Sequence, residues 1–159
     1  LEKYKQAVIK PIYGNGGDGV FLLSKKDLNL NQILESFLSG NKEPFMVQKY
    51  LPEIIRGDKR VILVNGKPVG AIARVPKQNE IRSNIHVGGS AKKVSISRSD
   101  YAICDEIGPE LKKRKLFFVG IDIIGKYLTE INVTSPTCLR EIKKLTKIDI
   151  AKIIWNQLT

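Results

Sequence analysis

Cysteine and histidine, from which most transition-metal sites are built, are nearly missing from this sequence. Cys104 and Cys138 are its two cysteines, they lie far apart, and neither belongs to a Cys-x-x-Cys pair. His86 is its one histidine and lies in a polar stretch, where a solvent-exposed loop position is expected. The sequence therefore disfavours a zinc site and predicts two reduced thiols, which points to a cytoplasmic protein.

Long apolar runs are missing as well. No stretch approaches the roughly 20 apolar residues that a membrane helix needs, so no membrane association is expected. The chain starts at Leu1 rather than at a methionine, and no charged-then-apolar leader follows, so we expect a truncated N-terminus. Its 159 residues are 42% hydrophobic and 27% charged, which suffices for one core or for two small lobes around a cleft.

Acidic residues are outnumbered, at 16 against 27 lysines and arginines, and the net charge is +11. Such an excess raises the alternative of a nucleic-acid-binding domain. However, the basic residues are scattered, and no dense Lys/Arg block is interleaved with aromatic residues. We therefore favour a cleft that holds a polyanion such as ATP, or a merely lysine-rich composition, over nucleic-acid binding.

The apolar pattern predicts an α+β chain built mainly from antiparallel hairpins. Helices are predicted at 28–39, 99–115 and 139–158, and strands at 6–12, 20–23, 45–48, 59–64, 68–74, 117–124 and 128–133. The polar stretch after the fifth strand has little periodicity and predicts a mobile loop at about 77–92. We expect a small lobe at 1–50 and a larger lobe at 51–159, with a ligand in the cleft between them.

Glycine is concentrated between the first two predicted strands. Gly14, Gly16 and Gly19 match the spacing G-x-G-x-x-G, but a dinucleotide fingerprint would open a helix here, and a Walker A loop would end in Gly-Lys-Ser/Thr. A protein-kinase loop would be followed by its lysine, whereas Lys10 precedes this one, and no H-R-D or D-F-G run is present. Glycines nevertheless let backbone N–H groups approach phosphate oxygens, so a phosphate-binding loop and a flexible turn both remain open.

The last predicted hairpin brings three oxygen-bearing side chains together. A three-residue turn places Ile121 opposite Ile131 and Asp122 opposite Glu130, whereas a two-residue turn places Ile121 opposite Glu130. The apolar pattern favours the first register, because it gathers Asp122, Glu130 and Asn132 on one face. Two carboxylates and an amide suit magnesium bound together with phosphates, and a solvated polar face is the alternative.

Four segments resemble the bacterial glutathione synthetases, a family of the ATP-grasp superfamily. They are Asp-Lys-Arg-Val at 58–61, Ala-Arg-Val-Pro at 73–76, Gly-Ile-Asp-Ile-Ile-Gly at 120–125 and Thr-Glu-Ile-Asn-Val-Thr-Ser-Pro-Thr at 129–137. The resemblance covers essentially the whole chain, with the last segment its most specific part and the glycine loop its least. It implies the ATP-grasp fold, in which two α+β lobes with antiparallel sheets hold ATP between them.

The resemblance also implies an activity, the ligation of γ-glutamylcysteine with glycine through an acyl phosphate, giving glutathione, ADP and phosphate. It implies ATP and Mg²⁺, or Mn²⁺ in its place, as cofactors, small-molecule partners rather than nucleic acid or membrane, and a homo-oligomeric full-length enzyme. An N-terminal substrate domain is typical of the family and absent from this chain, so the fragment alone is expected to be inactive. The nearest alternative is another ATP-grasp carboxylate–amine ligase, which would differ around 74–90 and 135–137.

Site residues follow from the same resemblance. For the nucleotide, it implies phosphate contacts at Lys10, Gly14, Asn15, Gly16, Gly17 and Gly19, an adenine hinge at Gln48, Lys49, Tyr50 and Leu51, and a ribose contact at Asp58. For catalysis it implies Arg60, Arg74 and Arg82, for the metal Asp122, Glu130 and Asn132, and for the substrates Arg60, Arg82, Gly89, Ser135 and Thr137. Arginines and magnesium fit the chemistry, because a carboxylate must approach an equally anionic γ-phosphate. One departure is Asp18, an acid inside the phosphate loop.

Overall fold

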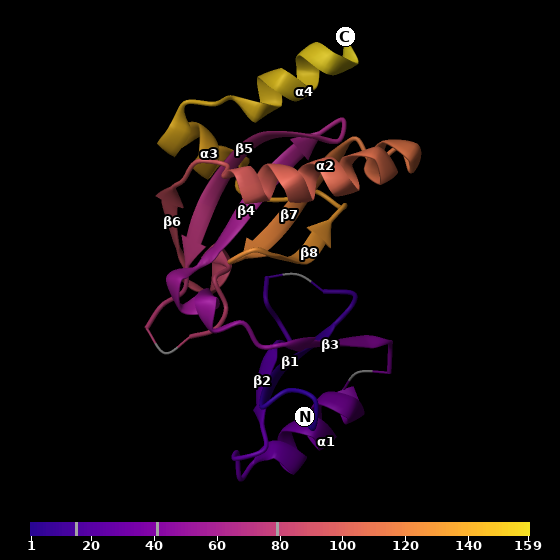
Figure 1. Cartoon of the computed structure of the whole chain (residues 1–159), viewed down its shortest axis with the longest axis vertical. Helices are drawn as coiled ribbons and strands as arrows, with labels where there is room; N and C mark the ends of the chain where they lie inside the picture. The colour runs from indigo at the N-terminus through magenta and orange to yellow at the C-terminus, as the bar shows by residue number, and fades with distance from the viewer. Residues whose placement is uncertain (15, 41, 79) are drawn as a thin grey trace.

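The computed structural model describes residues 1–14, 16–40, 42–78 and 80–159, and they form two lobes stacked along the long axis of the molecule (Figure 1). The small lobe contains β1 (Gln6–Pro11), β2 (Phe21–Ser24), α1 (Leu30–Gly40) and β3 (Phe45–Lys49). Its strands form an antiparallel sheet in the order β2-β1-β3. Helix α1 packs on one face of this sheet, where Phe37 meets Ile9 and Leu23 in a small core.

The large lobe contains the second sheet, in the order β6-β5-β4-β7-β8 and antiparallel throughout. Its elements are η1 (Pro52–Arg56), β4 (Asp58–Val64), β5 (Lys67–Val75), η2 (Ile85–Val87), β6 (Ser90–Lys93), α2 (Arg98–Lys113), β7 (Phe118–Ile124), β8 (Tyr127–Asn132), α3 (Leu139–Thr146) and α4 (Ile150–Leu158). The α+β prediction is confirmed, and so is each predicted strand to within one or two residues.

Strand β4 is buried on both faces, which explains its unbroken apolar run. Val61 and Leu63 point into a core with α2, whereas Ile62 and Val64 point into a second core with α3 and α4. The face that carries Ile62 also carries Arg60, because alternate residues of a strand share a face. Strand β4 begins at the end of the sheet that lies toward the small lobe, whereas α3 and α4 lie toward the opposite end (Figure 1).

The single closing helix predicted at 139–158 is wrong. Helix α3 ends where Lys147 adopts a left-handed conformation (φ 68°) and donates its N–H to the carbonyl of Lys143. Asp149 then caps α4 by accepting a hydrogen bond from the N–H of Lys152. The break carries no glycine or proline, so its sequence signal is the capping residue Asp149, and the apolar periodicity runs across it.

The predicted loop at about 77–92 is shorter than expected at its C-terminal end. Residues from Ser90 onward form β6, which pairs with β5 through Ser90 opposite Val75 and Ala91 opposite Arg74. The four residues Ser-Ala-Lys-Lys carry little apolar alternation, so the strand is specified by the sheet edge that it joins rather than by its own pattern. Movement of the remaining loop stays a prediction.

Both thiols are buried and unpaired. Burial raises the pKa of Cys104 to about 11, so that thiol stays protonated at neutral pH and suits a core position better than a nucleophile. Among the described residues, no helix is long and apolar enough to cross a membrane.

Candidate active site

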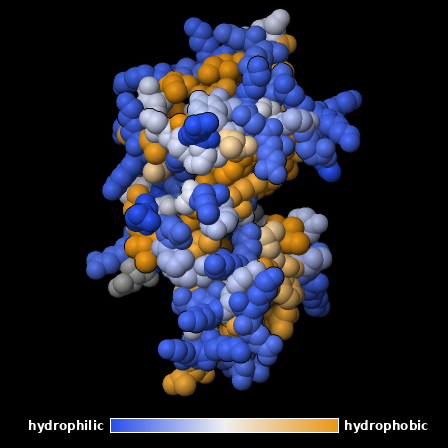
Figure 2. Space-filling view, viewed as in Figure 1, coloured by the Kyte–Doolittle hydropathy of each residue, from blue (hydrophilic) through white to orange (hydrophobic). Residues whose placement is uncertain are grey.

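A pocket of about 220 Å³ lies between the two lobes. Gln48, Lys49 and Leu51 line it from the small lobe and the connection that follows, and 127–129 line it from β8. Figure 2 shows the hollow between the lobes on this face of the molecule. Three of the four residues of the predicted adenine hinge therefore line the pocket, and the N–H of the fourth, Tyr50, bonds to Gln6 of β1. Since ligand pockets usually span about 300–1,000 Å³, this one suits part of a nucleotide.

The β7–β8 hairpin holds the predicted metal-binding side chains in the predicted register. Asp122 lies opposite Glu130, and Ile121 lies opposite Ile131. Asn132 lies opposite Gly120, two residues farther along, so it shares a face with Glu130. The alternation of apolar residues was therefore a sound guide to which side chains share this face.

The turn that produces this register is not the predicted one. Ile124 pairs with Tyr127, so the turn has two residues rather than three. The register shifts between Asp122 and Ile123, where a β-bulge leaves Thr129 as the extra residue of β8. The bulge compensates for the shorter turn, and the face assignment is correct for a reason that the sequence did not reveal.

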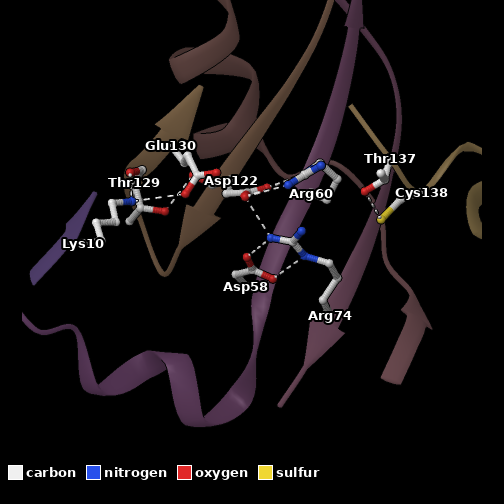
Figure 3. Close-up of polar contacts among 9 residues, drawn as sticks. All are labelled: Lys10, Asp58, Arg60, Arg74, Asp122, Thr129, Glu130, Thr137 and Cys138. Atoms are coloured by element: carbon white, nitrogen blue, oxygen red, sulfur yellow. Dashed lines mark hydrogen bonds and ion pairs between the residues drawn. The ribbon is translucent and has the colours of Figure 1, made fainter. Parts of the chain in front are cut away.

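Lys10 of β1, in the small lobe, contacts the β7–β8 hairpin that carries the predicted metal-binding side chains. Its Nζ lies 3.1 Å from Oε2 of Glu130 and 3.4 Å from the carbonyl oxygen of Thr129 (Figure 3). The residue predicted to bind phosphate and a residue predicted to bind magnesium thus neutralise each other in this structure. A nucleotide bound with magnesium would give each of them a new partner, a phosphate oxygen for Lys10 and the metal ion for Glu130.

The donor set fits magnesium. No group of three His, Cys, Asp or Glu residues clusters within 1–14, 16–40, 42–78 and 80–159, so a transition-metal cage is not found there. Two carboxylates and an amide are instead hard oxygen donors. Among the described residues, the side-chain Nδ2 of Asn132 is buried and has no hydrogen-bond partner. Because the two ends of a side-chain amide have the same shape, turning the amide over places its oxygen at this position.

Asp122 also belongs to a buried network of two arginines and two aspartates, which adjoins the predicted metal-binding face (Figure 3). Arg74 donates hydrogen bonds to the carboxylate of Asp58 from Nε, at 2.9 Å, and from Nη2. Its Nη2 also lies 2.8 Å from Oδ2 of Asp122. Arg60 binds Asp122 with a second fork, through Nε and, at 2.8 Å, through Nη2. All four side chains are at most 6% exposed, and their charges cancel.

Electrostatics distinguishes the two aspartates of this network. Burial raises the pKa of Asp58 more than its hydrogen bond from Arg74 lowers it, and the carboxylate of Asp122 adds to the rise. Burial acts on Asp122 too, but Arg60 and Arg74 outweigh it, so the pKa of Asp122 falls below its usual value. Burial alone would lower the pKa of Arg74, whereas the two carboxylates raise it above its usual value. Asp122 therefore stays ionised beside the metal-binding face.

Asp58 was expected at the ribose, and its carboxylate is instead occupied by Arg74. In this structure Asp58 holds an arginine in place, and a ribose contact stays a prediction.

Arg82 differs from the other two arginines, because it is only partly buried and its Nη2 pairs with Oε2 of Glu80 at 2.7 Å. That hydrogen bond lowers the pKa of Glu80 to about 2, so the pair is fully charged at neutral pH. Glu80 was not among the predicted site residues, and its one sequence signal is its spacing of two residues from Arg82.

The glycine loop approaches the loop that carries Arg82. Gly17 has φ +86°, and a Cβ built on it would lie 2.8 Å from Oδ1 of Asn84 and 3.2 Å from Cδ of Arg82. Its positive φ therefore favours glycine, and a Cβ there would also push the side chain of Asn84 aside. The hydrogen bond with Glu80 is the main cause that raises the pKa of Arg82, and the charge of Asp18 adds to it, so the unexpected acid of the loop lies near a cation. Asn15, which the resemblance assigns to phosphate binding, lies outside the described residues.

Gly89, Ser135 and Thr137 were predicted to contact substrate. The N–H of Gly89 donates to the carbonyl of Asn84 at 3.1 Å, and a Cβ at Gly89 would come within 2.2 Å of the carbonyl oxygen of Ser83, so its observed role is to close the loop on itself. Ser135 and Thr137 are exposed on either side of the buried Pro136. Pro136 packs on Gly120, whose other neighbour is the side chain of Arg60, so the 135–137 segment lies beside that arginine.

The family model for the prokaryotic glutathione synthetase ATP-grasp domain matches residues 1–147. The chain belongs to this family. It is 48% identical to the glutathione synthetase of Mesorhizobium japonicum over 98% of its length and 49% identical to that of Synechococcus elongatus over 94%. It covers 50% and 46% of those two proteins, so it spans about half the length of the curated relatives that it matches.

A solved structure of the ATP-grasp ligase PsnB with a phosphomimetic variant of its minimal precursor, Mg and ADP resembles this glutathione synthetase family chain in fold. The TM-score is 0.66, the sequence identity is 21%, and the match covers 99% of this chain and 47% of the other. The ATP-grasp fold expected from the sequence is thus confirmed.

Proposed function

We propose that this chain is the ATP-using part of a glutathione synthetase, which joins γ-glutamylcysteine to glycine and releases ADP and phosphate. Sequence identity of 48% to glutathione synthetases over nearly the whole chain supports the substrate class. The observation that carries the proposal is that Lys10 lies opposite Glu130 beside the inter-lobe pocket, because phosphate transfer needs a cation and a metal-binding oxygen there together.

In this proposal the adenine base enters the pocket next to Gln48 and Leu51, and the phosphates run toward Lys10 and the glycine loop. Asp122, Glu130 and Asn132 would hold magnesium, or manganese in its place, which would neutralise charge on the phosphates. Lys10 would exchange the carboxylate of Glu130 for a phosphate oxygen, since both are anionic acceptors for its ammonium group.

The reaction then needs two substitution steps. The cysteinyl carboxylate of the dipeptide attacks the γ-phosphorus, the bond to ADP breaks, and an acyl phosphate forms. The glycine amine attacks its carbonyl carbon, loses a proton and expels phosphate, which leaves the new amide. Arg60 and Arg82 are placed to neutralise the approaching anions: Arg60 binds Asp122 through Nε and Nη2, which leaves its Nη1 outside that fork, and Arg82 lies on the loop beside the glycine turn.

The loop at 77–89 is expected to close over the substrates and protect the acyl phosphate from water. Trypsin should therefore cut after Lys77 and Arg82 in the ligand-free intact enzyme, and ATP, magnesium and dipeptide together should suppress these cuts. The exposed basic stretch at 113–115, at the far end of α2, serves as the control and should be cut equally in both states. Equal cleavage of the loop with and without ligands would count against a lid.

ADP release from the intact enzyme tests the proposed function directly. ADP should form when γ-glutamylcysteine, glycine and magnesium are all present, and mass spectrometry should find glutathione in equal amount. Other amino acids and dipeptides are supplied in parallel, because another ATP-grasp ligase would prefer one of them. Release of ADP with such a substrate, and none with glycine, would replace the proposed reaction by that alternative.

The same proposal covers location and assembly. The enzyme would work in the cytoplasm on small molecules, as a homo-oligomer.

The rival function, nucleic-acid binding, predicts an association with DNA or RNA that weakens steeply as salt rises. An electrophoretic mobility shift at low and high salt separates the two, because the proposed ligase should give no shift at either.

A further inference from the structure

Thr129 decides which way Glu130 points. It is the extra residue of the β-bulge in β8, between the pair Asp122–Glu130 and the pair Ile123–Leu128. If β8 paired regularly from the two-residue turn, with no bulge at Thr129, the carboxylate at position 130 would lie opposite Ile121, which is fully buried in the α2 core. The bulge therefore keeps the two predicted metal-binding carboxylates on one face.

The side chain of Thr129 fastens the bulge to the opposite strand. Its Oγ1 donates a hydrogen bond to the backbone carbonyl of Asp122 at 3.1 Å, in a partly buried position. The residue thus bonds to the main chain of one proposed metal ligand and is the chain neighbour of the other. A one-residue insertion has no ladder partner of its own, so this bond is what ties it to β7.

The backbone carbonyl of Thr129 faces the small lobe. It accepts hydrogen bonds from Nε2 of Gln48 at 3.1 Å and from Nζ of Lys10 at 3.4 Å, which come from β3 and β1. Thr129 also lines the inter-lobe pocket beside Gln48. Two of the small-lobe side chains proposed to touch the nucleotide therefore dock on this one residue.

We propose that Thr129 is a positioning residue that couples docking of the small lobe to the geometry of the magnesium ligands. Its hydroxyl holds the bulge that sets Asp122 against Glu130, and its carbonyl takes up the two donors from the other lobe. This inference rests on the proposed function, since it assumes that a nucleotide and magnesium meet at this face. Loss of the hydroxyl should weaken the response to magnesium more than the binding of ATP itself.

The test compares the dissociation constant of ATP in the intact protein, measured by calorimetry with and without saturating magnesium. The readout is the dissociation constant without magnesium divided by the constant with magnesium, and this ratio can be measured without turnover. Thr129→Ser and Thr129→Ala differ only in the hydroxyl, and Thr129→Val keeps the shape of threonine. The matched control is Thr146→Val in α3, where Oγ1 donates to the carbonyl of Ile142 at 2.7 Å, away from the cleft.

We expect the ratio to fall about tenfold or more in Thr129→Ala and Thr129→Val, the size typical for a residue that orients metal ligands. Thr129→Ser should retain most of it, and Thr146→Val should leave it unchanged. An unchanged ratio in Thr129→Ala, or an equal loss in Thr129→Ser, would overturn the proposal. So would unfolding of both hydroxyl-free variants by circular dichroism, because Thr129 would then act on stability. If the wild type shows no magnesium effect at all, the proposed function fails with it.

Discussion

Replacing Glu130 with glutamine is expected to slow ATP turnover by about 100-fold or more while the fold survives. The substitution keeps the size of the side chain and removes the charge that would face magnesium, which must stabilise the phosphates as the bond to ADP breaks. The fold should tolerate the change, because the side chain of Glu130 is 46% exposed and its ion pair with Lys10 is worth no more than about 1 kcal/mol.

Turnover across a magnesium titration measures this effect in the intact enzyme, with circular dichroism to confirm folding. Glu110→Gln is the matched control, since Glu110 is half exposed on α2 and forms a surface ion pair with Arg114 at 2.7 Å. It undergoes the same chemical change far from the pocket and should turn over like the wild type. Wild-type turnover and an unaltered magnesium requirement in Glu130→Gln would remove Glu130 from the metal site.

Replacing Arg74 with methionine is expected to lower the free energy of unfolding by about 3–5 kcal/mol. Arg74 is 3% exposed and binds the carboxylates of both Asp58 and Asp122, so its loss removes a partner from each of two buried charges. Methionine fills much of the same volume, so the cost arises from the charges more than from a cavity. The free energy of unfolding of Arg74→Lys should lie between those of the wild type and Arg74→Met. Lysine keeps the positive charge, but an ammonium cannot form the two-pronged bond to Asp58.

Urea denaturation at constant m-value measures this loss. Arg114→Met, whose side chain is 68% exposed, is the control and should cost less than about 1 kcal/mol. The deficit of Arg74→Met should also grow between pH 5 and pH 8. Burial already raises the pKa of Asp58, and without the arginine that pKa rises further above its unfolded value, so the stability that protonation supplies is lost as pH increases. A deficit below 1 kcal/mol, or one that shrinks with pH, would contradict the network.

Local patterns of the sequence were enough for the elements and for their faces. The alternation along 119–133 placed Asp122 with Glu130, and the apolar pattern predicted the strand at 59–64, which forms β4 at 58–64. These features could be predicted because side-chain periodicity depends on the backbone geometry of one element at a time. Family resemblance then supplied roles for residues that the pattern alone could not distinguish from a solvated surface.

Pairing between strands depended instead on two β-bulges, and neither leaves a mark in the sequence. The Asn65-Gly66 turn alone would set Asp58 opposite Ala73, but the register shift between Ile62 and Leu63 moves Asp58 opposite Arg74 and creates the buried ion pair. The bulge at Thr129 likewise moves Glu130 opposite Asp122. A bulge inserts one residue where the packing of neighbouring strands and helices favours it, so its position is set by contacts between distant parts of the chain. The sequence by itself determined which residues could form the site, and only the tertiary structure decided which of them face one another.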